Sequence, residues 1–285
     1  MKLCRFGAPG AEKPGLIDAH GAIRDLSGVV NDIDAAALSP DSLERLAAFP
    51  VDQLPLAPAN ARYGVPVAGT RKFIAIGLNY ADHAAESNLP IPSEPVVFSK
   101  WVNCLQGAND PVIIPRDSTK TDWEVELGVV IGTAAYDVDE ADALAHVAGY
   151  CVVNDVSERH WQQERGPTWD KGKGFPTFGP VGPWLVTGDE VGDPQALSMW
   201  LEVNGKRVQD GSTRTMIFSV AQIVAYCSRF MALEPGDIIT TGTPPGVGLG
   251  QKPEPWYLKH GDIVRLGIEG LGEQQQLFTS VRETA

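Results

Sequence analysis

The chain has 285 residues, of which 43% are hydrophobic and 21% are charged, the proportions of an ordinary globular protein. Its 36 acidic and 23 basic residues give a formal net charge of −13, without a basic run, which argues against binding to nucleic acid or to an anionic membrane surface. No apolar stretch approaches the roughly 20 residues that span a bilayer, and the first residues lack the apolar segment of a secretion signal. The 4 separated cysteines contain no Cys-x-x-Cys pair, which argues against a zinc site and a disulfide framework and favours buried thiols in a reducing cytoplasm.

The length suggests one large domain with a smaller appendage. We expect residues 1–68 to form a small N-terminal domain. Short strand-like pieces at 3–6, 15–18 and 22–26 are followed there by a helical stretch at 42–48. A Pro-rich passage that contains Pro50, Pro55, Pro58 and Pro66 then predicts an extended connector.

Residues 69–285 form the larger part, which begins with a short buried strand at 73–77. Apolar runs then alternate with Gly/Pro turns at 96–98, 112–114, 125–131, 148–153, 184–186, 200–203, 238–241 and 263–268. Helical periodicity is clearest at 141–146 and 219–231. With 30 Gly and 22 Pro, the pattern predicts a β-rich α+β fold with few helices instead of an alternating βαβ fold.

Two carboxylates stand at the start of the apolar run 125–131. Successive side chains of a strand point to opposite faces, so Glu124 and Glu126 share one face. Asp155 has a similar setting on the apolar run that begins near Tyr150. Glu124 and Glu126 alone could line a solvated sheet face. Together with Asp155 they predict a site for a hard cation such as Mg²⁺ or Mn²⁺.

A histidine and a glutamate follow the strand expected at 73–77. His83 and Glu86 are three residues apart, so on a helical turn they share one face and can hydrogen-bond. A carboxylate beside an imidazole fixes its tautomer and raises its basicity, as a general base acting on water requires. The alternative is an exposed pair at the start of a helix.

Arg159 and Gln162 follow Asp155 in a segment that leaves a strand and enters a turn or a short helix. A guanidinium and an amide near a metal suit a substrate carboxylate and carbonyl. The alternative is a surface salt bridge and a solvated amide.

Two glycine-rich segments complete the candidate site. Residues 170–180 are expected to be too rigid and glycine-rich for a helix, and they fail the pattern of a phosphate-binding loop. Lys173 in this loop could approach a cleft and stabilise a developing enolate oxygen. The loop 240–250 fails the dinucleotide fingerprint because of its paired prolines. Its exposed hydroxyls and amides could hold a carboxylate, or it could be only a tight turn.

In this order and at these spacings, the motifs resemble the fumarylacetoacetate hydrolase superfamily over about residues 70–270. They are GLNY at 77–80 with His83 and Glu86, Glu124-x-Glu126, Asn154-Asp155 with Arg159 and Gln162, the Lys173 loop, and TGTPPG at 241–246. The segments EKPG at 12–15 and IRDLSG at 23–28 resemble the bacterial branch that acts on 2,4-diketo-3-deoxy sugar acids. Members of that branch are also often labelled ureidoglycolate lyase.

The resemblance implies a mixed β-sheet roll with the small N-terminal domain, usually assembled as a dimer. It also implies Mg²⁺ or Mn²⁺ on Glu124, Glu126 and Asp155. His83 and Glu86 would lie on a mobile segment that orders over bound substrate. One departure is Pro176, where relatives often carry an acidic residue, which alters the hydrogen bonding expected around Lys173.

The implied activity is metal-dependent hydrolysis of a carbon–carbon bond in an acylpyruvate-type 2,4-diketo acid. The expected substrate is L-2,4-diketo-3-deoxyrhamnonate or the fuconate analogue, giving pyruvate and L-lactate. His83, oriented by Glu86, would deprotonate a water that attacks the distal carbonyl. Arg159, Gln162 and Thr243 would anchor the substrate. The metal and Lys173 would stabilise the pyruvate enolate. Oxaloacetate decarboxylation and ureidoglycolate cleavage are alternatives within the superfamily, and a non-catalytic binding module that kept the fold is another.

Overall fold

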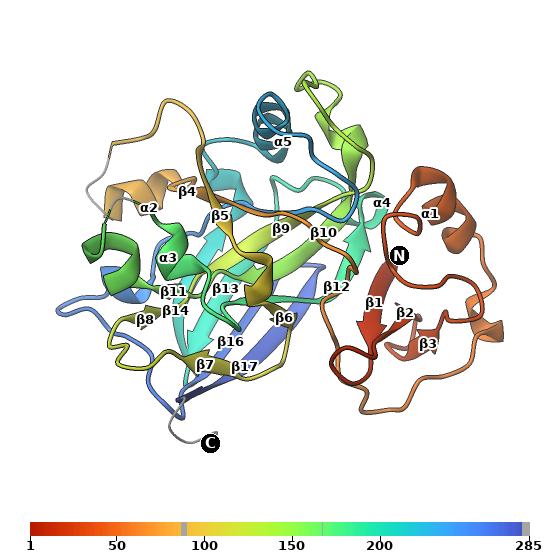
Figure 1. Ribbon diagram of the computed structural model, residues 1–285, viewed down its shortest axis with the longest axis horizontal. Helices are drawn as coiled ribbons and strands as arrows, with labels where there is room; N and C mark the ends of the chain where they lie inside the picture. The colour runs from red at the N-terminus through yellow and green to blue at the C-terminus, as the bar shows by residue number, and fades with distance from the viewer. Residues whose placement is uncertain (87–89, 167, 281–285) are drawn as a thin grey trace.

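The computed structural model describes residues 1–86, 90–166 and 168–280, which form three sheets with short helices around them (Figure 1). The strands are β1 Lys2–Phe6, β2 Lys13–Ile17, β3 Ile23–Asp25, β4 Phe73–Gly77, β5 Val96–Lys100, β6 Leu105–Gly107, β7 Val112–Ile114, β8 Thr121–Asp122, β9 Val125–Ile131, β10 Val147–Asn154, β11 Ser157–Glu158, β12 Gly179–Thr187, β13 Ser198–Val203, β14 Lys206–Ser212, β15 Ile238–Thr240, β16 Ile263–Ile268 and β17 Gly272–Ser280.

The helical segments are short. They are α1 Pro40–Ala47, η1 Val51–Gln53, α2 Ala81–Glu86, η2 Val102–Cys104, η3 Ala143–His146, η4 His160–Glu164, α3 Asp170–Lys173, α4 Gly188–Val191, η5 Thr213–Thr215, α5 Val220–Ser228 and η6 Gly248–Gly250. None of the described helices is long and apolar enough to cross a membrane.

The large sheet is mixed, as the family resemblance implies. Its strand order is β3-β2-β1-β12-β10-β9-β15-β4-β5, with β6 parallel to β12 off this path. β9 pairs antiparallel with both β10 and β15, whereas β15 runs parallel to β4. All of β9 is buried, which fits its continuous run of Val, Leu and Ile around Glu126 and Gly128. The predicted β-rich α+β fold is confirmed.

A five-stranded sheet, in the order β14-β13-β16-β17-β7, lies behind the β9–β10 part of the large sheet (Figure 1). Buried amides join the two layers. Gln274 Nε2 donates to the carbonyl oxygens of Val152 (2.7 Å) and Gly182 (3.0 Å). Asn154 Nδ2 donates to Gln276 Oε1 at 3.0 Å. Because these polar atoms are paired, they can be buried at the layer contact at low cost, and they fix the end of β10.

The first three strands extend the large sheet. β1 pairs antiparallel with β12, Leu3 opposite Leu185, while α1 lies above these strands in the view of Figure 1. Arg62 bonds both Glu12 and Asp110, which ties this part to the rest of the chain. The large sheet contains strands from both predicted domains, residues 1–68 and residues 69–285. Their division therefore remains a prediction. Residues 281–285 of the predicted catalytic domain lie outside the described residues.

Several predicted elements are confirmed with small shifts at their ends. The helix expected at 219–231 is α5, which begins with a capping box formed by Ser219 and Gln222. The helical segment expected at 141–146 is shorter and of a different type, because it forms the single 3₁₀ turn η3.

The expectation that residues 170–180 contain no helix is wrong. Residues 170–173 form the helical turn α3, closed by a hydrogen bond from the Gly174 amide to the Asp170 carbonyl. Gly172 permits this turn because a Cβ there would lie 2.6 Å from the backbone nitrogen of Gln162 and from the carbonyl oxygen of Glu158. The glycine serves close packing here instead of breaking the helix.

Candidate active site and metal centre

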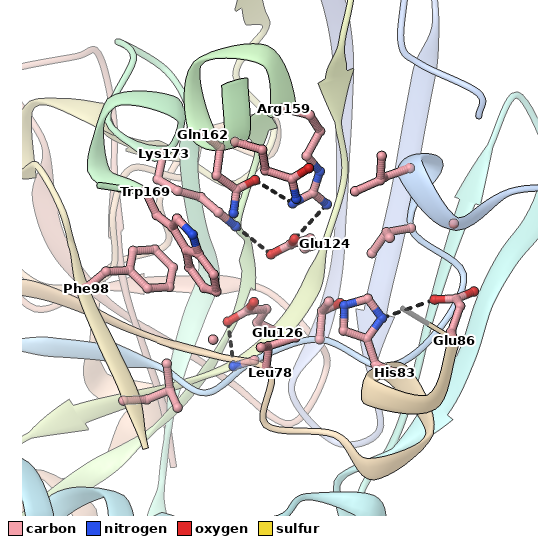
Figure 2. Close-up of a pocket in the computed structure, with 18 of the residues that line it drawn as sticks. Leu78, His83, Glu86, Phe98, Glu124, Glu126, Arg159, Gln162, Trp169 and Lys173 are labelled. Carbon is pink, nitrogen blue, oxygen red and sulfur yellow. Dashed lines mark hydrogen bonds and ion pairs between the residues drawn. The ribbon is translucent and has the colours of Figure 1, made fainter. Parts of the chain in front are cut away.

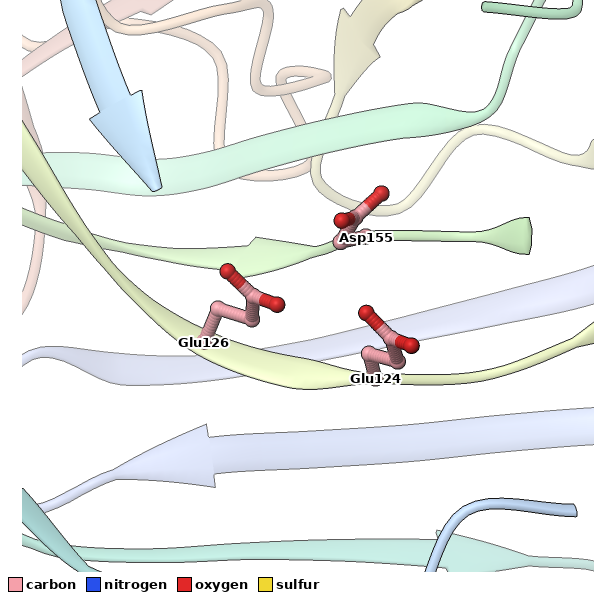
Figure 3. Close-up of side chains that lie close together, drawn as sticks. All are labelled: Glu124, Glu126 and Asp155. Carbon is pink, nitrogen blue, oxygen red and sulfur yellow. The ribbon is translucent and has the colours of Figure 1, made fainter. Parts of the chain in front are cut away.

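The three predicted metal ligands come together at one end of the β9–β10 pair. Glu124 directly precedes β9, Glu126 lies within it on the same face, and Asp155 directly follows β10 (Figure 3). The pairing of Glu126 with Val153 and of Val125 with Asn154 places the ends of both strands side by side. The three side chains are buried, and one oxygen from each lies within 4.8 Å of the others.

Cationic side chains approach two of the three carboxylates. Lys173 Nζ lies 2.8 Å from both Glu124 Oε2 and Asp155 Oδ2. Arg159 Nη2 lies 2.7 Å from Glu124 Oε1, and Lys100 Nζ lies 2.6 Å from Asp155 Oδ1. Glu126 instead accepts hydrogen bonds from the Gly242 amide at 2.8 Å and from the Thr240 hydroxyl. Within the described part of the chain, no lysine or arginine lies within ion-pair distance of Glu126.

These different surroundings shift the pKa values of Glu124 and Glu126 in opposite directions. Burial opposes ionisation of Glu124, but the charges of Lys173 and Arg159 outweigh it and hold the pKa of Glu124 well below its ordinary value. Burial, with the charges of Asp155 and Glu124 added, raises the pKa of Glu126 well above its ordinary value. The ionised form of Glu126 would therefore be stabilised by a further positive charge at this site.

The donor set fits a divalent ion. It offers carboxylate oxygens only, which Mg²⁺ and Mn²⁺ prefer. Asp155 Oδ1 is buried and has no partner in hydrogen-bond geometry, although Lys100 Nζ lies close to it. Glu124, Glu126 and Asp155 could therefore hold the ion, and an ion there would neutralise the unbalanced charge at Glu126.

Lys173 is the last residue of α3 and is buried against the cluster. Its ammonium has three donors, of which Glu124 and Asp155 take two, so one N–H remains available to a ligand. It also lies 5.4 Å from the ring centre of Phe98. Pro176 is exposed, and these carboxylates hold Lys173 without an acidic residue at that position.

The predicted pair of His83 and Glu86 is formed on α2. His83 Nδ1 lies 3.1 Å from Glu86 Oε2, and the Gly246 amide donates to both Glu86 oxygens at 3.2 and 3.3 Å. Burial would raise the pKa of Glu86, but its hydrogen bonds to His83 and Gly246 outweigh this and leave the pKa lowered. An ionised Glu86 fixes the imidazole tautomer by accepting the Nδ1 proton and leaves Nε2 as the basic atom.

The predicted substrate-binding residues also reach this region, with some of their donors already used. Arg159 donates from Nε to Asp122 at 2.7 Å and from Nη1 to Gln162 Oε1 at 2.9 Å. The side-chain amide nitrogen of Gln162 is thereby oriented away from Arg159. The Thr243 hydroxyl donates to the Val125 carbonyl and accepts from Gln209, both at 2.9 Å. A contact of Thr243 with substrate would therefore use the remaining acceptor capacity of its oxygen or its backbone.

One cavity of about 440 Å³ brings these groups together. In Figure 2, Lys173, Gln162 and Arg159 lie above Glu124, whereas His83 and Glu86 lie below and to its right. Phe98 and Trp169 line another wall, with ring centres 5.4 Å apart at 69°. Of the residues predicted for the site, Asp155 is the one that does not line the cavity; it lies behind Lys173.

Sequence reasoning missed two buried charged residues at this site. Lys100 ends an apolar strand, and a lone lysine in that position gives no sign of the carboxylate that it meets. Asp122 precedes Glu124 by two residues, so its place in an Asp-x-Glu-x-Glu pattern could have identified it. Both side chains are 0% exposed.

Comparison with known proteins shows the family to which this chain belongs. The family model for the fumarylacetoacetate (FAA) hydrolase C-terminal region matches residues 72–279. A Burkholderia multivorans protein with the provisional name of hydrolase is 64% identical over 282 residues, which cover 99% of this chain and 100% of the relative.

Solved structures give the same result. A fumarylacetoacetate hydrolase from psychrophilic Exiguobacterium antarcticum is 35% identical, with a TM-score of 0.84, over 98% of this chain and 99% of the other. A maleylpyruvate hydrolase from Sphingobium sp. SYK-6, solved with manganese(II) and pyruvate, is 28% identical, with a TM-score of 0.82 and the same coverage of both chains. The chain belongs to the fumarylacetoacetate hydrolase family.

Proposed function

We propose that this protein is a divalent-metal-dependent hydrolase that cleaves a carbon–carbon bond in an acylpyruvate. The observation that carries the proposal is the single cavity in which a histidine–glutamate pair faces a buried cluster of carboxylates with a lysine. A base for water, an acidic ligand set for Mg²⁺ or Mn²⁺ and a cation for an enolate are the groups that such a cleavage needs.

His83 has the role of general base in this proposal. Glu86 holds Nδ1, and Nε2 takes a proton from water as the water oxygen bonds to the distal carbonyl carbon. The bond between C3 and C4 then breaks, and its electron pair passes to the pyruvate enolate, which takes up a proton. The distal fragment leaves as a carboxylic acid.

Lys173 has the role of donor to the enolate oxygen, through the N–H that Glu124 and Asp155 leave unused. When bound, a divalent ion supplies Lewis-acid stabilisation of negative charge on the substrate oxygens. Arg159 and Gln162 orient the carboxylate end of the substrate, and the walls of Phe98 and Trp169 exclude water around it.

The finer choice of substrate is L-2,4-diketo-3-deoxyrhamnonate or its fuconate analogue, which would give pyruvate and L-lactate. A maleylpyruvate-like substrate is the second choice, because it carries the same pyruvoyl end and is named for the Sphingobium relative. A dimer in the cytoplasm is proposed as the working state of the enzyme, and sedimentation velocity would test the assembly.

The decisive experiment measures the release of pyruvate, or of glyoxylate in the case of ureidoglycolate, by metal-depleted protein before and after addition of Mg²⁺ or Mn²⁺. The substrates are the diketo-deoxy sugar acid, maleylpyruvate, oxaloacetate and ureidoglycolate. Metal-dependent turnover of either of the first two supports the proposal. Turnover of oxaloacetate alone would identify a decarboxylase, and turnover of ureidoglycolate alone a lyase. Full activity in excess chelator would refute the metal, and Mn²⁺ binding without any turnover would favour a binding module.

A further inference from the structure

Asp122, in β8, is a buried carboxylate that the proposed chemistry does not use. Its side chain is 0% exposed and does not line the cavity. Oδ1 accepts from the backbone amides of Gly248 at 2.6 Å and Trp123 at 2.7 Å. Oδ2 accepts from the Leu249 amide at 2.9 Å and from Arg159 Nε at 2.7 Å. Both oxygens are thus saturated with donors from different parts of the chain.

One of these partners is Arg159, which lies on the side of the cavity proposed to bind the substrate carboxylate. With its Nε on Asp122, Arg159 is free to place Nη2 on Glu124 and Nη1 on Gln162. Since the guanidinium is planar, the contact at Nε fixes the direction of the other two nitrogens.

Two further partners, the amides of Gly248 and Leu249, lie in residues 246–250, the loop that contacts Glu86 of the His83–Glu86 pair. The Gly246 amide of this loop donates to Glu86, and a Cβ at Gly250 would lie 2.8 Å from Glu86 Cδ. Trp123, whose own amide binds Asp122, donates from Nε1 to the Gly246 carbonyl at 3.1 Å. The loop is therefore anchored at Gly248–Leu249 by Asp122 itself, and at Gly246 by Trp123, whose own amide binds Asp122.

We propose that Asp122 is the positioning residue that links the two sides of the cavity, fixing Arg159 on one side and the loop under Glu86 on the other. The role requires a carboxylate. Asparagine has one acceptor oxygen, and its NH₂ group would face an N–H donor in place of the second oxygen. The inference rests on the proposed function for its kinetic consequences only, because the linkage itself can be measured without a substrate.

The first experiment is hydrogen–deuterium exchange on Asp122→Asn. We expect faster exchange in residues 246–250 and also in α2, because Glu86 loses its support there. The matched control is Asp237→Asn. Asp237 is 0% exposed and accepts from the amides of Lys72 (2.9 Å) and Glu234 (2.8 Å), but it does not line the cavity. Asp237→Asn should speed exchange near its own partners and leave α2 unchanged.

The second experiment uses an acylpyruvate substrate. Asp122→Asn should lower kcat by at least tenfold and raise KM, because both the base and the anion-binding group move, while Asp237→Asn leaves both within about twofold at a temperature where each variant is folded. Should Asp122→Asn fail to fold, Gln162→Ala and Glu86→Gln are combined instead. If Asp122 links the two sides, the effect of the double variant on kcat/KM should differ more than threefold from the product of the two single effects.

The inference is overturned if exchange in α2 is the same in Asp122→Asn as in the wild type, or if Gln162→Ala and Glu86→Gln act additively. Absence of acylpyruvate turnover by the wild type would overturn the proposed function instead, and the exchange experiment would still decide the role of Asp122.

Discussion

Lys100 Nζ lies 2.6 Å from Asp155 Oδ1, and both side chains are closed to solvent. The same ammonium donates to the carbonyl oxygen of Lys173 at 2.5 Å and to that of Val156 at 3.4 Å. A single buried cation from the end of β5 therefore holds one carboxylate of the proposed metal site together with the backbone of the proposed enolate donor. Removal of Lys100 should therefore affect both the metal site and the position of Lys173.

Lys100→Met should lower the free energy of unfolding by about 3–5 kcal/mol in EDTA, since breaking a buried ion pair leaves an uncompensated charge. The loss should be smaller with Mn²⁺ present, because a bound ion would compensate Asp155. Urea unfolding with and without Mn²⁺ measures both values. As a control, Lys13→Met removes a lysine that is 59% exposed and pairs with Asp25 at 3.6 Å. Such a surface pair is worth about 0–1 kcal/mol, and the change should not depend on Mn²⁺. An equal loss in both variants would contradict the prediction.

Glu124→Gln and Glu126→Gln should both weaken Mn²⁺ binding by at least about 100-fold, since outer partners of a metal site alone are worth 10–100-fold. Their effects on the metal-free protein should differ. Glu124→Gln should destabilise it by about 3–5 kcal/mol because Lys173 and Arg159 lose a charged partner. Glu126→Gln should be neutral or stabilising, because it removes a carboxylate without a cation. Titration calorimetry and melting in EDTA test these statements, and wild-type Mn²⁺ affinity in both variants would rule out the metal site.

His83→Ala should reduce kcat by about 10²–10⁴-fold, the usual contribution of a general base. Mn²⁺ affinity should stay near the wild-type value because His83 is not a member of the carboxylate cluster. Pyruvate release under saturating substrate measures the first quantity and calorimetry the second. His20→Ala, at an exposed position in the N-terminal region, is the control. An unaltered rate in His83→Ala would remove the base from the mechanism.

Glu86 should make stability depend on pH in one direction. Its pKa is lowered from 4.5 in the folded protein, so its contribution is complete above that value and is lost as pH falls through the lower folded value. The difference in unfolding free energy between wild type and Glu86→Gln should accordingly be present at pH 7 and shrink on acidification. Urea unfolding across this range checks the sign. A difference that grows towards acid pH would mean that Glu86 is not stabilised as an anion.

Lys252 lines the cavity and is exposed; its charge helps to lower the pKa of Glu86, but within the described chain no side chain lies at ion-pair distance from it. It is therefore placed to meet a negative group at the distal end of a substrate. Lys252→Met should lower kcat/KM for maleylpyruvate about fivefold, the size of an exposed ion pair. The value for the uncharged distal chain of diketo-deoxyrhamnonate should change little. Lys259→Met, which lies outside this cavity, is the control. An equal loss of kcat/KM on both substrates would show that Lys252 does not recognise a negative charge at the distal end of the substrate.

The central part of the fold was predictable because its residues are apolar and continuous. β9 and β10 are nearly uniform runs of buried β-forming residues, and the same-face rule for Glu124 and Glu126 holds in the structure. β14 and β17 were not predicted. β17 buries Gln274 and Gln276 at alternate positions, and these amides look like surface residues until their partners on β10 and β12 are known.

The catalytic candidates were predictable to a similar extent. Spacing of three residues was enough to pair His83 with Glu86 on α2. Spacing could not reveal Lys100, because its partner Asp155 comes from a different strand and meets it only after the sheet has formed. The helical turn at Lys173 was missed because glycine content argues against helices, whereas close packing at Gly172 requires glycine there.

The register of β9 against β10 also makes the carboxylate cluster a reporter of folding. Val125 is opposite Asn154 and Glu126 opposite Val153, so a slip of one residue would turn Glu126 to the other side of the sheet. Three oxygens can gather around one ion only in the native alignment. The appearance of Mn²⁺ binding during refolding would therefore time the moment at which the centre of the sheet becomes correctly paired, even before α2 has taken its place.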